Sequence, residues 1–342
     1  MTPLSNFGEW EAVRRMTKAL GRPRIPSPHK ILAGPGDDAA VVNISTPSRL
    51  AFTTDAMVEG THFRLDWMRR FFGENEVWRA LGQKAMAANL SDLAAMGAVR
   101  PILALLTFGG RGDISVDTVE NLCRGISNIT SFFGFSVIGG DTIRSDKTIV
   151  SICLVGELIT HKQILRNGAG IGDVLMCSGY LGLSMAGLKI LEKRTGSYNK
   201  HERLAVRRHL VPSPRLKEGA FLGNVENKTT SMIDTSDDLL TSLEILSRES
   251  RVGFECDLSG VPVHPALKRI SGDLRLSPYS FVLYGGEDYE LLFTVPASIV
   301  ERVRRKIPSS YVLGRVMPEG CGVKILKDGG PFRAKDVRFR HF

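Results

Sequence analysis

Short apolar runs alternate with longer stretches of helical spacing through the first half of the chain. The runs are rich in β-branched residues, which is typical of strands, and the amphipathic stretches between them predict helices. The first helix is expected to end at Gly97, because glycine is favoured just after a helix. The predicted elements are strands at 50–54, 102–108 and 148–157 and helices at 74–96 and 116–133.

The second half also mixes strands and helices, and it opens with a glycine-rich turn at 167–172. The polar segment 196–202 is expected to form a surface loop. The other predicted elements are strands at 173–178, around Met232 and at 289–295, and helices at 182–191, 237–249 and 299–306.

Length and pattern together predict an α/β (α+β) protein of two domains. A single hydrophobic core stops growing well before 342 residues, so the chain is expected to divide. The strand at 148–157 completes the first half, and the glycine-rich turn opens the second. The predicted domains are therefore 1–158 and 159–342.

Composition narrows the class of protein. Hydrophobic residues make up 43%, charged residues 24%, and the mean hydropathy is -0.02, values that are ordinary for globular proteins. No apolar run approaches the roughly 20 residues of a membrane span, and no signal-peptide pattern is visible, so we expect a cytoplasmic protein without a membrane partner. The 5 cysteines are scattered and never paired as Cys-x-x-Cys, which argues against disulfides and zinc.

The net charge of +9 comes mostly from the C-terminal segment. A basic tail can bind nucleic acid. No motif of interleaved aromatic residues accompanies it, and attraction of small anionic substrates explains the charge as well. No nucleic-acid partner is therefore predicted.

The strongest chemical signal is a set of acidic clusters, most of which follow apolar runs. They are Asp37-Asp38, Thr53-Thr54-Asp55, Asn89-Leu90-Ser91-Asp92, Asp141-Thr142 and Asp234-Thr235-Ser236-Asp237-Asp238. Carboxylate and hydroxyl oxygens without histidine or cysteine suit Mg²⁺ rather than zinc. Each cluster alone is explained more simply as turn residues or a helix N-cap. Asp92 is different, because it is predicted near a helix C-terminus, where the macrodipole disfavours a carboxylate and a metal would offset the cost.

Three of the acidic segments directly follow glycine: Gly36-Asp37-Asp38, Gly139-Gly140-Asp141 and Gly285-Gly286-Glu287-Asp288. Glycine permits tight turns, so we expect these carboxylates at turns. Neither a P-loop nor a protein-kinase motif is present. Arg144 and Arg166 flank glycine-rich segments and could bind phosphate oxygens, although a solvated arginine explains each equally well. His62 follows the Asp55 cluster, and a lone histidine is more often structural than functional.

Taken together, six motifs in order resemble the thiamine-monophosphate kinase family, which belongs to the superfamily of aminoimidazole ribonucleotide synthetase. They are Gly34-Pro-Gly-Asp-Asp-Ala39, Thr53-Thr-Asp55 with Glu59-Gly-Thr-His-Phe63, Lys84-Ala-Met-Ala-Ala-Asn-Leu-Ser-Asp-Leu-Ala-Ala-Met-Gly97, Ile138-Gly-Gly-Asp-Thr142, Ile233-Asp-Thr-Ser-Asp237 and Tyr284-Gly-Gly-Glu-Asp-Tyr-Glu-Leu291. The resemblance implies an N-terminal β-rich domain that pairs with a second subunit in a shared barrel, and a C-terminal α/β domain. It also implies a homodimer that phosphorylates thiamine monophosphate to thiamine diphosphate, with ATP as co-substrate and several Mg²⁺ ions.

Matched position by position, the resemblance implies roles for individual residues. The implied metal ligands are Asp38, Thr53, Thr54, Asp55, Asp92, Asp234 and Asp237. The implied nucleotide contacts are Gly140, Asp141, Arg166 and Ser236, and the implied substrate contacts are His62, Glu287 and Phe339. Asp237, as a ligand of the metal, and Arg166 are assigned the catalytic part, because metals and arginines offset the negative charge of the phosphates.

Two positions depart from the family pattern. Phe339 stands where the family usually has Trp or Tyr, and Asp238 stands where it has glycine. Two interpretations of Asp238 stay open. The backbone there could need a positive φ, which Asp tolerates better than most residues, or the carboxylate could be a further metal ligand. Asp37 and Asp288 are interpreted as structural neighbours of the ligands.

The implied reaction needs no general base. A phosphate has a second pKa of about 6, so the attacking oxygen is largely ionised near neutral pH. Metals and arginines then have only to offset repulsion between anions and hold the groups in line, which predicts direct transfer. The alternatives are another ATP-using purine-biosynthesis synthetase of the superfamily and a non-catalytic nucleotide-binding scaffold, which Asp238 and the basic tail motivate.

Overall fold

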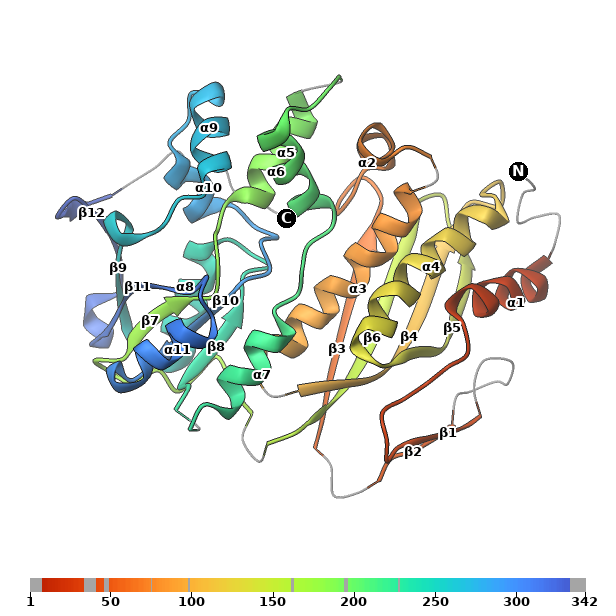
Figure 1. The fold of residues 1–342 in the computed structure, drawn as a ribbon, viewed down its shortest axis with the longest axis horizontal. Coiled ribbons are helices and arrows are strands. Elements are labelled where there is room, and N and C mark those ends of the chain that lie inside the picture. Colours follow the sequence, from red (N-terminus) through yellow and green to blue (C-terminus); the bar gives the residue numbers. More distant parts are fainter. Residues whose placement is uncertain are drawn as a thin grey trace. The chain divides into compact units, whose positions relative to one another are not determined.

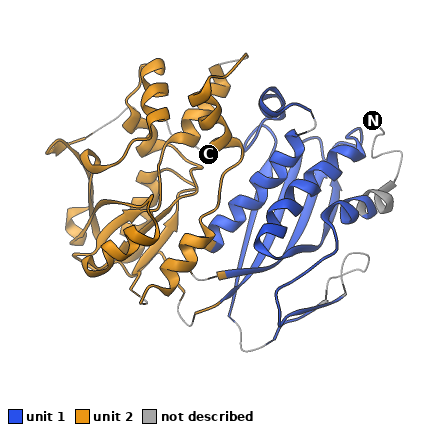
Figure 2. Cartoon of the chain, viewed as in Figure 1, with its two compact units in different colours: residues 1–93, 100–158 blue, residues 94–99, 159–342 orange. Residues whose placement is uncertain are grey.

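A computed structural model describes residues 8–33, 41–45, 49–74, 76–97, 99–160, 163–193, 196–226 and 228–332. The chain divides into two compact units (Figure 2). Unit 1 comprises residues 1–93 and 100–158, and unit 2 comprises residues 94–99 and 159–342. In these described ranges, no helix is long and apolar enough to cross a membrane.

The described part of unit 1 is a sheet with helices over one face (Figure 1). Its strands are β1 (Lys30–Ala33), β2 (Val41–Asn43), β3 (Leu50–Val58), β4 (Val99–Gly110), β5 (Ser136–Arg144) and β6 (Ile149–Leu158). Its helices are α1 (Gly8–Leu20), α2 (Leu65–Phe72), α3 (Val77–Ala95) and α4 (Val116–Phe133). The sheet has the order β3, β6, β4, β5, with β3 antiparallel to β6 and β4 parallel to β5, while β1 and β2 form a separate pair.

Helix α3 is the core helix of unit 1, rich in Ala and Leu and buried along most of its length. It crosses α4 closely because glycine lies at both contact points. A Cβ on Gly82 would collide with the carbonyl oxygen of Leu122, and one on Gly125 would collide with that of Arg79. Helices α3 and α4 lie side by side over the sheet (Figure 1), and polar residues of α3 meet strand β3.

Unit 2 is built around a sheet of order β13, β12, β9, β11, β7, β10, β8. The strands are β7 (Val174–Cys177), β8 (Ser231–Asp234), β9 (Gly253–Asp257), β10 (Leu291–Val295), β11 (Tyr311–Met317), β12 (Val323–Lys327) and β13 (Gly330–Pro331). The helices are α5 (Leu183–Lys193), α6 (Lys200–Leu210), α7 (Leu216–Asn224), α8 (Leu239–Ser250), α9 (Pro265–Leu274), α10 (Pro278–Tyr284) and α11 (Val300–Lys306). Short 3-10 turns lie at Leu258–Gly260, Ala297–Ile299 and Glu319–Cys321.

The loops that carry the acidic motifs lie together at one end of strands β7, β8 and β10. β10 runs antiparallel to β7 and β8, with Leu292 opposite Cys177 and Leu291 opposite Asp234. The carboxyl ends of β7 and β8 therefore meet the amino end of β10. We call this side the loop edge; its loops are residues 178–182, 235–238 and 285–290.

The predicted α/β class is confirmed, and most predicted elements are present. The helix predicted at 116–133 is α4, and the helix ending at Gly97 is α3, with Gly97 at φ +95°. The loop predicted at 196–202 is confirmed for residues 196–199 and wrong for the rest, because α6 begins at Lys200. Asn199 and Glu202 form a reciprocal capping box there, which makes the polar segment a helix start.

Candidate functional site

The predicted ligands of unit 1 come together where β3 faces α3. The Thr53 hydroxyl donates a hydrogen bond to the Asp92 carboxylate, and the backbone N–H of Asp55 donates to the Asn89 side-chain oxygen at 3.2 Å. Asp92 lies in the last turn of α3, as predicted. Asn89 is held in turn by a 3.0 Å bond from its amide nitrogen to the Ala85 carbonyl. The two elements thus bring together the Thr53 hydroxyl, the Asp92 carboxylate and the Asn89 amide, and strand alternation puts Asp55 on the same face as Thr53.

Asp55 does not lie at the end of a strand, which corrects the prediction. The predicted strand at 50–54 continues as β3 to Val58, because residues 50–58 all pair with β6. Asp55 is half-buried, and burial raises the pKa of its carboxyl above the ordinary range. Strand alternation puts Thr54 on the opposite face from Thr53 and Asp55, and Thr54 is exposed.

His62 lies in a compact loop directly after β3. The Val58 N–H donates to His62 Nδ1 at 3.1 Å, and the Val58 carbonyl accepts from the N–H groups of Thr61 and His62. Gly60, at φ +85°, makes the turn between them possible. The ring of His62 is half-buried and fixed by its own loop.

Gly140 and Asp141 lie inside strand β5, not at a turn, which corrects a second prediction. They pair with Leu106 and Thr107 of β4. A Cβ on Gly140 would collide with the Leu106 carbonyl oxygen, so glycine is needed for close strand approach and not for a turn. Asp141 is exposed, and its carboxylate accepts from the N–H of Thr142 at 2.8 Å.

In unit 2, the predicted ligands lie on the loop edge. Asp234 is the buried last residue of β8, while Ser236 and Asp237 are exposed on the loop that follows. This loop is tied to the 285–290 loop by main-chain bonds: the Thr235 carbonyl accepts from Tyr289, and the Ser236 carbonyl accepts from Glu287 at 2.8 Å. The two loops therefore form one structural element.

Asp238 is a helix cap. Its φ is -75°, so this position does not require the positive φ that glycine would provide. The carboxylate accepts from the N–H of Thr241 at 2.8 Å and from its hydroxyl at 2.9 Å, which caps the N-terminus of α8. The structure accounts for Asp238 without a metal.

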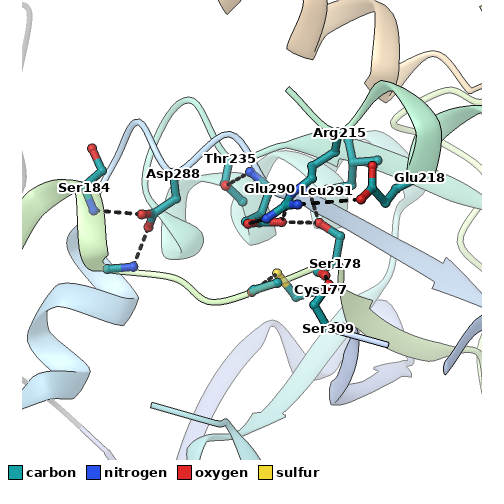
Figure 3. Close-up of polar contacts among 12 residues, drawn as sticks. Cys177, Ser178, Ser184, Arg215, Glu218, Thr235, Asp288, Glu290, Leu291 and Ser309 are labelled. Carbon is teal, nitrogen blue, oxygen red and sulfur yellow. Dashed lines mark hydrogen bonds and ion pairs between the residues drawn. The ribbon is translucent and has the colours of Figure 1, made fainter. Parts of the chain in front are cut away.

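Glu287 and Asp288 have separate surroundings. Glu287 Oε2 lies 3.1 Å from Nδ1 of the buried His209, whose ring also lies 3.1 Å from the Ser184 hydroxyl. Asp288 instead accepts hydrogen bonds from the N–H groups of Gly182 and Ser184 at the start of α5 (Figure 3). Burial raises the pKa of its carboxyl to about 7, against the hydrogen bonds, which favour the charged form. Asp288 serves structure, as its interpretation as a neighbour of the ligands suggested.

A buried ionic network lies beneath these loops, and sequence reasoning missed it. Arg215 donates to both carboxylate oxygens of Glu290, one at 2.7 Å, and the Ser178 hydroxyl donates to the same carboxylate at 2.5 Å (Figure 3). Glu290 is 1% exposed. The N–H of Leu291 donates to Ser178 Oγ at 2.8 Å, so the network joins β10 to the end of β7. The sequence did contain a signal: Glu290 directly precedes an apolar strand. A carboxylate buried at such a place needs an oppositely charged partner.

Arg166 is exposed, and its backbone is held away from the loop edge. Its carbonyl accepts from the hydroxyl of Ser250, which ends α8, and the neighbouring Leu165 carbonyl accepts from Met232. Asp237 precedes the opposite end of α8, a helix of 12 residues. The structure therefore does not bring the Arg166 backbone to Asp237.

Some predicted positions fall beyond the structural description. Asp37, Asp38 and Phe339 lie outside the described residues. Within the described ranges, no three carboxylate, imidazole or thiol side chains form a group that could hold a metal ion.

Comparisons with known proteins agree on one family. The family model for AIR synthase related protein, N-terminal domain, matches residues 36–158. Thiamine-monophosphate kinase from Buchnera aphidicola subsp. Schizaphis graminum is 31% identical over 91% of this chain and 93% of its own length. The enzyme from Escherichia coli K12 is 33% identical over 90% of this chain and 91% of its own length. The AaThiL structure complexed with AMPPCP and TMP has a TM-score of 0.74 and 28% identity, and the match covers 100% of this chain and 99% of that one.

Proposed function

This chain belongs to the thiamine-monophosphate kinase family, and we propose that it phosphorylates thiamine monophosphate by direct transfer of the γ-phosphate of ATP. Relatives with this name match most of its length, and the similar AaThiL structure is complexed with AMPPCP, an ATP analogue, and TMP. The fold is that of the aminoimidazole ribonucleotide synthetase superfamily.

The observation that carries the proposal is the oxygen-only cluster between β3 and α3. Thr53, Asp55, Asn89 and Asp92 offer hydroxyl, carboxylate and amide oxygens, the ligands that suit Mg²⁺. The raised pKa of the Asp55 carboxyl reflects a half-buried acid whose charged form a cation would stabilise. Mg²⁺, when bound, would offset the negative charge of the phosphates. The proposed ligands of the several Mg²⁺ ions are Asp38, Thr53, Asp55 and Asp92 from unit 1 and Asp234 and Asp237 from unit 2. Thr54 is not among them, because it lies on the opposite face of β3 from Thr53 and Asp55.

The remaining assignments are those that the resemblance to the family implies. Gly140, Asp141, Arg166 and Ser236 are the proposed nucleotide contacts. His62, Glu287 and Phe339 are the proposed contacts of thiamine monophosphate. Arg166 is exposed, which leaves its guanidinium accessible to phosphate oxygens. The two proposed catalytic residues have different tasks: Arg166 binds phosphate oxygens, and Asp237 holds Mg²⁺.

The reaction proposed here forms one P–O bond and breaks another. An ionised phosphate oxygen of thiamine monophosphate attacks the γ-phosphorus of ATP, and the β,γ-bridging oxygen leaves with ADP. No side chain has to remove a proton, and no residue has to carry the phosphoryl group. Protein recovered after incubation with γ-labelled ATP should therefore be unlabelled; a covalently labelled chain would rule out direct transfer.

We also propose a homodimer of cytoplasmic subunits, with residues 1–158 as the ATP- and Mg²⁺-binding and dimerisation domain and 159–342 as the C-terminal domain. Helices cover one face of the unit 1 sheet, while Phe52 of β3, Leu105 of β4 and Ile143 of β5 are 69%, 39% and 45% exposed. Exposed large apolar side chains on a sheet favour pairing with another surface. Sedimentation equilibrium of wild type and Phe52→Asp tests this, since the substitution should yield monomers.

The decisive test of function is ADP release from ATP by the purified chain when thiamine monophosphate is added. We expect release that requires Mg²⁺ and stops with a chelator, and we expect thiamine diphosphate as the other product. Turnover with a purine precursor in place of thiamine monophosphate would indicate the synthetase alternative. Nucleotide binding without turnover on either substrate would indicate a scaffold.

A further inference from the structure

Helix α3 meets β3 and the loop after it at three polar points. Asp92 accepts from Thr53, Asn89 accepts from the N–H of Asp55, and Lys84 Nζ lies 3.4 Å from the His62 carbonyl oxygen. Residue numbers rise from 53 to 62 along β3 and its loop while they fall from 92 to 84 along α3. This order is expected for a helix that packs antiparallel to a strand. The first two contacts hold proposed metal ligands. The third holds a proposed substrate contact.

Lys84 is the unusual member of this series, because it is 0% exposed. Lysine is almost never fully buried without polar partners, since removing an ammonium from water is costly. Its four-carbon stem is enclosed in the core of unit 1, and its ammonium donates to the main chain at His62. The burial therefore places a fixed donor under the His62 loop.

The same loop fixes the chemistry of the His62 ring. Nδ1 accepts a hydrogen bond from the Val58 N–H, so it cannot itself carry a proton. In the neutral ring the proton is then on Nε2. His62 is half-buried, and its Nε2–H group is a hydrogen-bond donor whose orientation depends on the loop main chain.

We propose that Lys84 is a positioning residue, which holds the main chain of His62 so that the Nε2–H group donates to a phosphate oxygen of thiamine monophosphate. This rests on the proposed function, and it adds the direction of the hydrogen bond and the residue that sets it. The phosphate end fits best, because Asp55 and Asp92, on the same two segments, are proposed to hold the metal ions that neutralise phosphate. Phosphate oxygens accept hydrogen bonds and cannot donate them when ionised.

Steady-state kinetics on Lys84→Met test the role of the ammonium. Methionine fills a similar volume without charge or donor. Loss of one well-placed hydrogen bond predicts a KM for thiamine monophosphate about tenfold higher, with the KM for ATP and kcat changed less than about threefold. Lys189→Met is the matched control, since Lys189 is a helix lysine paired with Glu192 outside the site, and its constants should equal those of wild type. An unchanged KM for thiamine monophosphate in Lys84→Met, or an equal rise for both substrates, would overturn the proposal.

Two further measurements separate positioning from general stability. The ¹⁵N spectrum of histidine-labelled wild type should show His62 with a bare Nδ1 and a protonated Nε2 at neutral pH; the reverse tautomer or a charged ring would overturn the proposal. Combining Lys84→Met with His62→Gln should raise the KM no further than about twofold beyond His62→Gln alone, because both changes remove one contact. An additive effect would be contrary evidence.

If Lys84→Met does not fold, Lys84→Arg decides, because it keeps the charge but displaces the donor. Its KM for thiamine monophosphate should rise while that for ATP is unchanged, and wild-type constants would overturn the proposal. Wild-type turnover is measured independently, so a failed phosphorylation assay is distinguishable from a failed role for Lys84.

Discussion

In unit 1 the candidate site residues lie on a strand and a helix, whereas in unit 2 they lie on loops between such elements. Thr53 and Asp55 belong to β3, and Asn89 and Asp92 belong to α3. Ser236, Asp237 and Glu287 belong to the loop edge. The first group is therefore placed by the register of regular elements, and the second by contacts made beneath the loops.

The loops of unit 2 also contain backbone strain. Glu287 and Tyr289 have φ of 60° and 52°, a conformation that costs non-glycine residues on the order of 1–3 kcal/mol. Two contacts stabilise this conformation of the loop. The Asp288 carboxylate accepts a hydrogen bond from the backbone at the start of α5, and the Glu290 carboxylate pairs with Arg215. Regular elements need no such anchors. Unit 2 should thus be more sensitive to changes in buried polar groups than unit 1.

The largest expected effects are on turnover, in both units alike. Asp92→Asn and Asp237→Asn keep the size of the side chain and remove its charge, so each should lower kcat about a thousandfold or more if the carboxylates hold the metals. The measurement is ADP release at saturating Mg²⁺, with circular dichroism to verify folding. Wild-type rates in either variant would remove that residue, and its unit, from the proposed metal site.

The next effect is on stability, and it tests the buried network beneath the loop edge of unit 2. Glu290→Gln removes the charge of the buried carboxylate that pairs with the half-buried Arg215 and leaves Arg215 only the 3.6 Å contact with Glu218, so it should lower the free energy of unfolding by about 3–5 kcal/mol. Urea denaturation measures it. The matched control is Glu192→Gln, which breaks the exposed pair with Lys189 and should cost less than about 1 kcal/mol. Equal costs for the two variants would mean that the loop edge does not depend on its buried network.

The sequence predicts the elements of both units well but the contacts of unit 2 poorly. Helical spacing is a local signal, so it placed α4 correctly and put Asn89 and Asp92 near the end of α3. The contact between Arg215 and Glu290 joins residues 75 positions apart, and only tertiary packing brings them together. The turn predicted at Gly140 was wrong for a related reason: a glycine required by a neighbouring strand looks like a turn glycine in a single sequence.

A third effect depends on pH and arises from Asp288. Its folded pKa of about 7 is raised above the unfolded value, so the folded state binds more protons between about pH 4 and 7. The contribution of this group therefore falls as pH rises through that window, by at most about 4 kcal/mol. Asp288→Asn removes the titration.

Stability measured by urea denaturation at several pH values tests this. The difference between wild type and Asp288→Asn should change steadily from about pH 4 to 7 and be constant outside that range. Other titrating groups, Asp55 among them, cancel in the difference. A difference that does not vary with pH would mean that the Asp288 carboxyl titrates alike in the folded and unfolded chain.

The smallest effect concerns Asp238, whose contacts the structure explains by a helix cap. Asp238 caps α8 through Thr241, so Asp238→Ala should cost about 1 kcal/mol of stability, and Asp238→Gly should cost only a few tenths relative to wild type. Because its carboxylate is occupied by the cap, both variants should retain most of the wild-type turnover. The neighbouring Asp237, exposed and one residue earlier, should behave in the opposite way, with turnover lost and stability kept. A loss of turnover in Asp238→Gly that matches Asp237→Asn would place both carboxylates in the metal site and make the cap a secondary role.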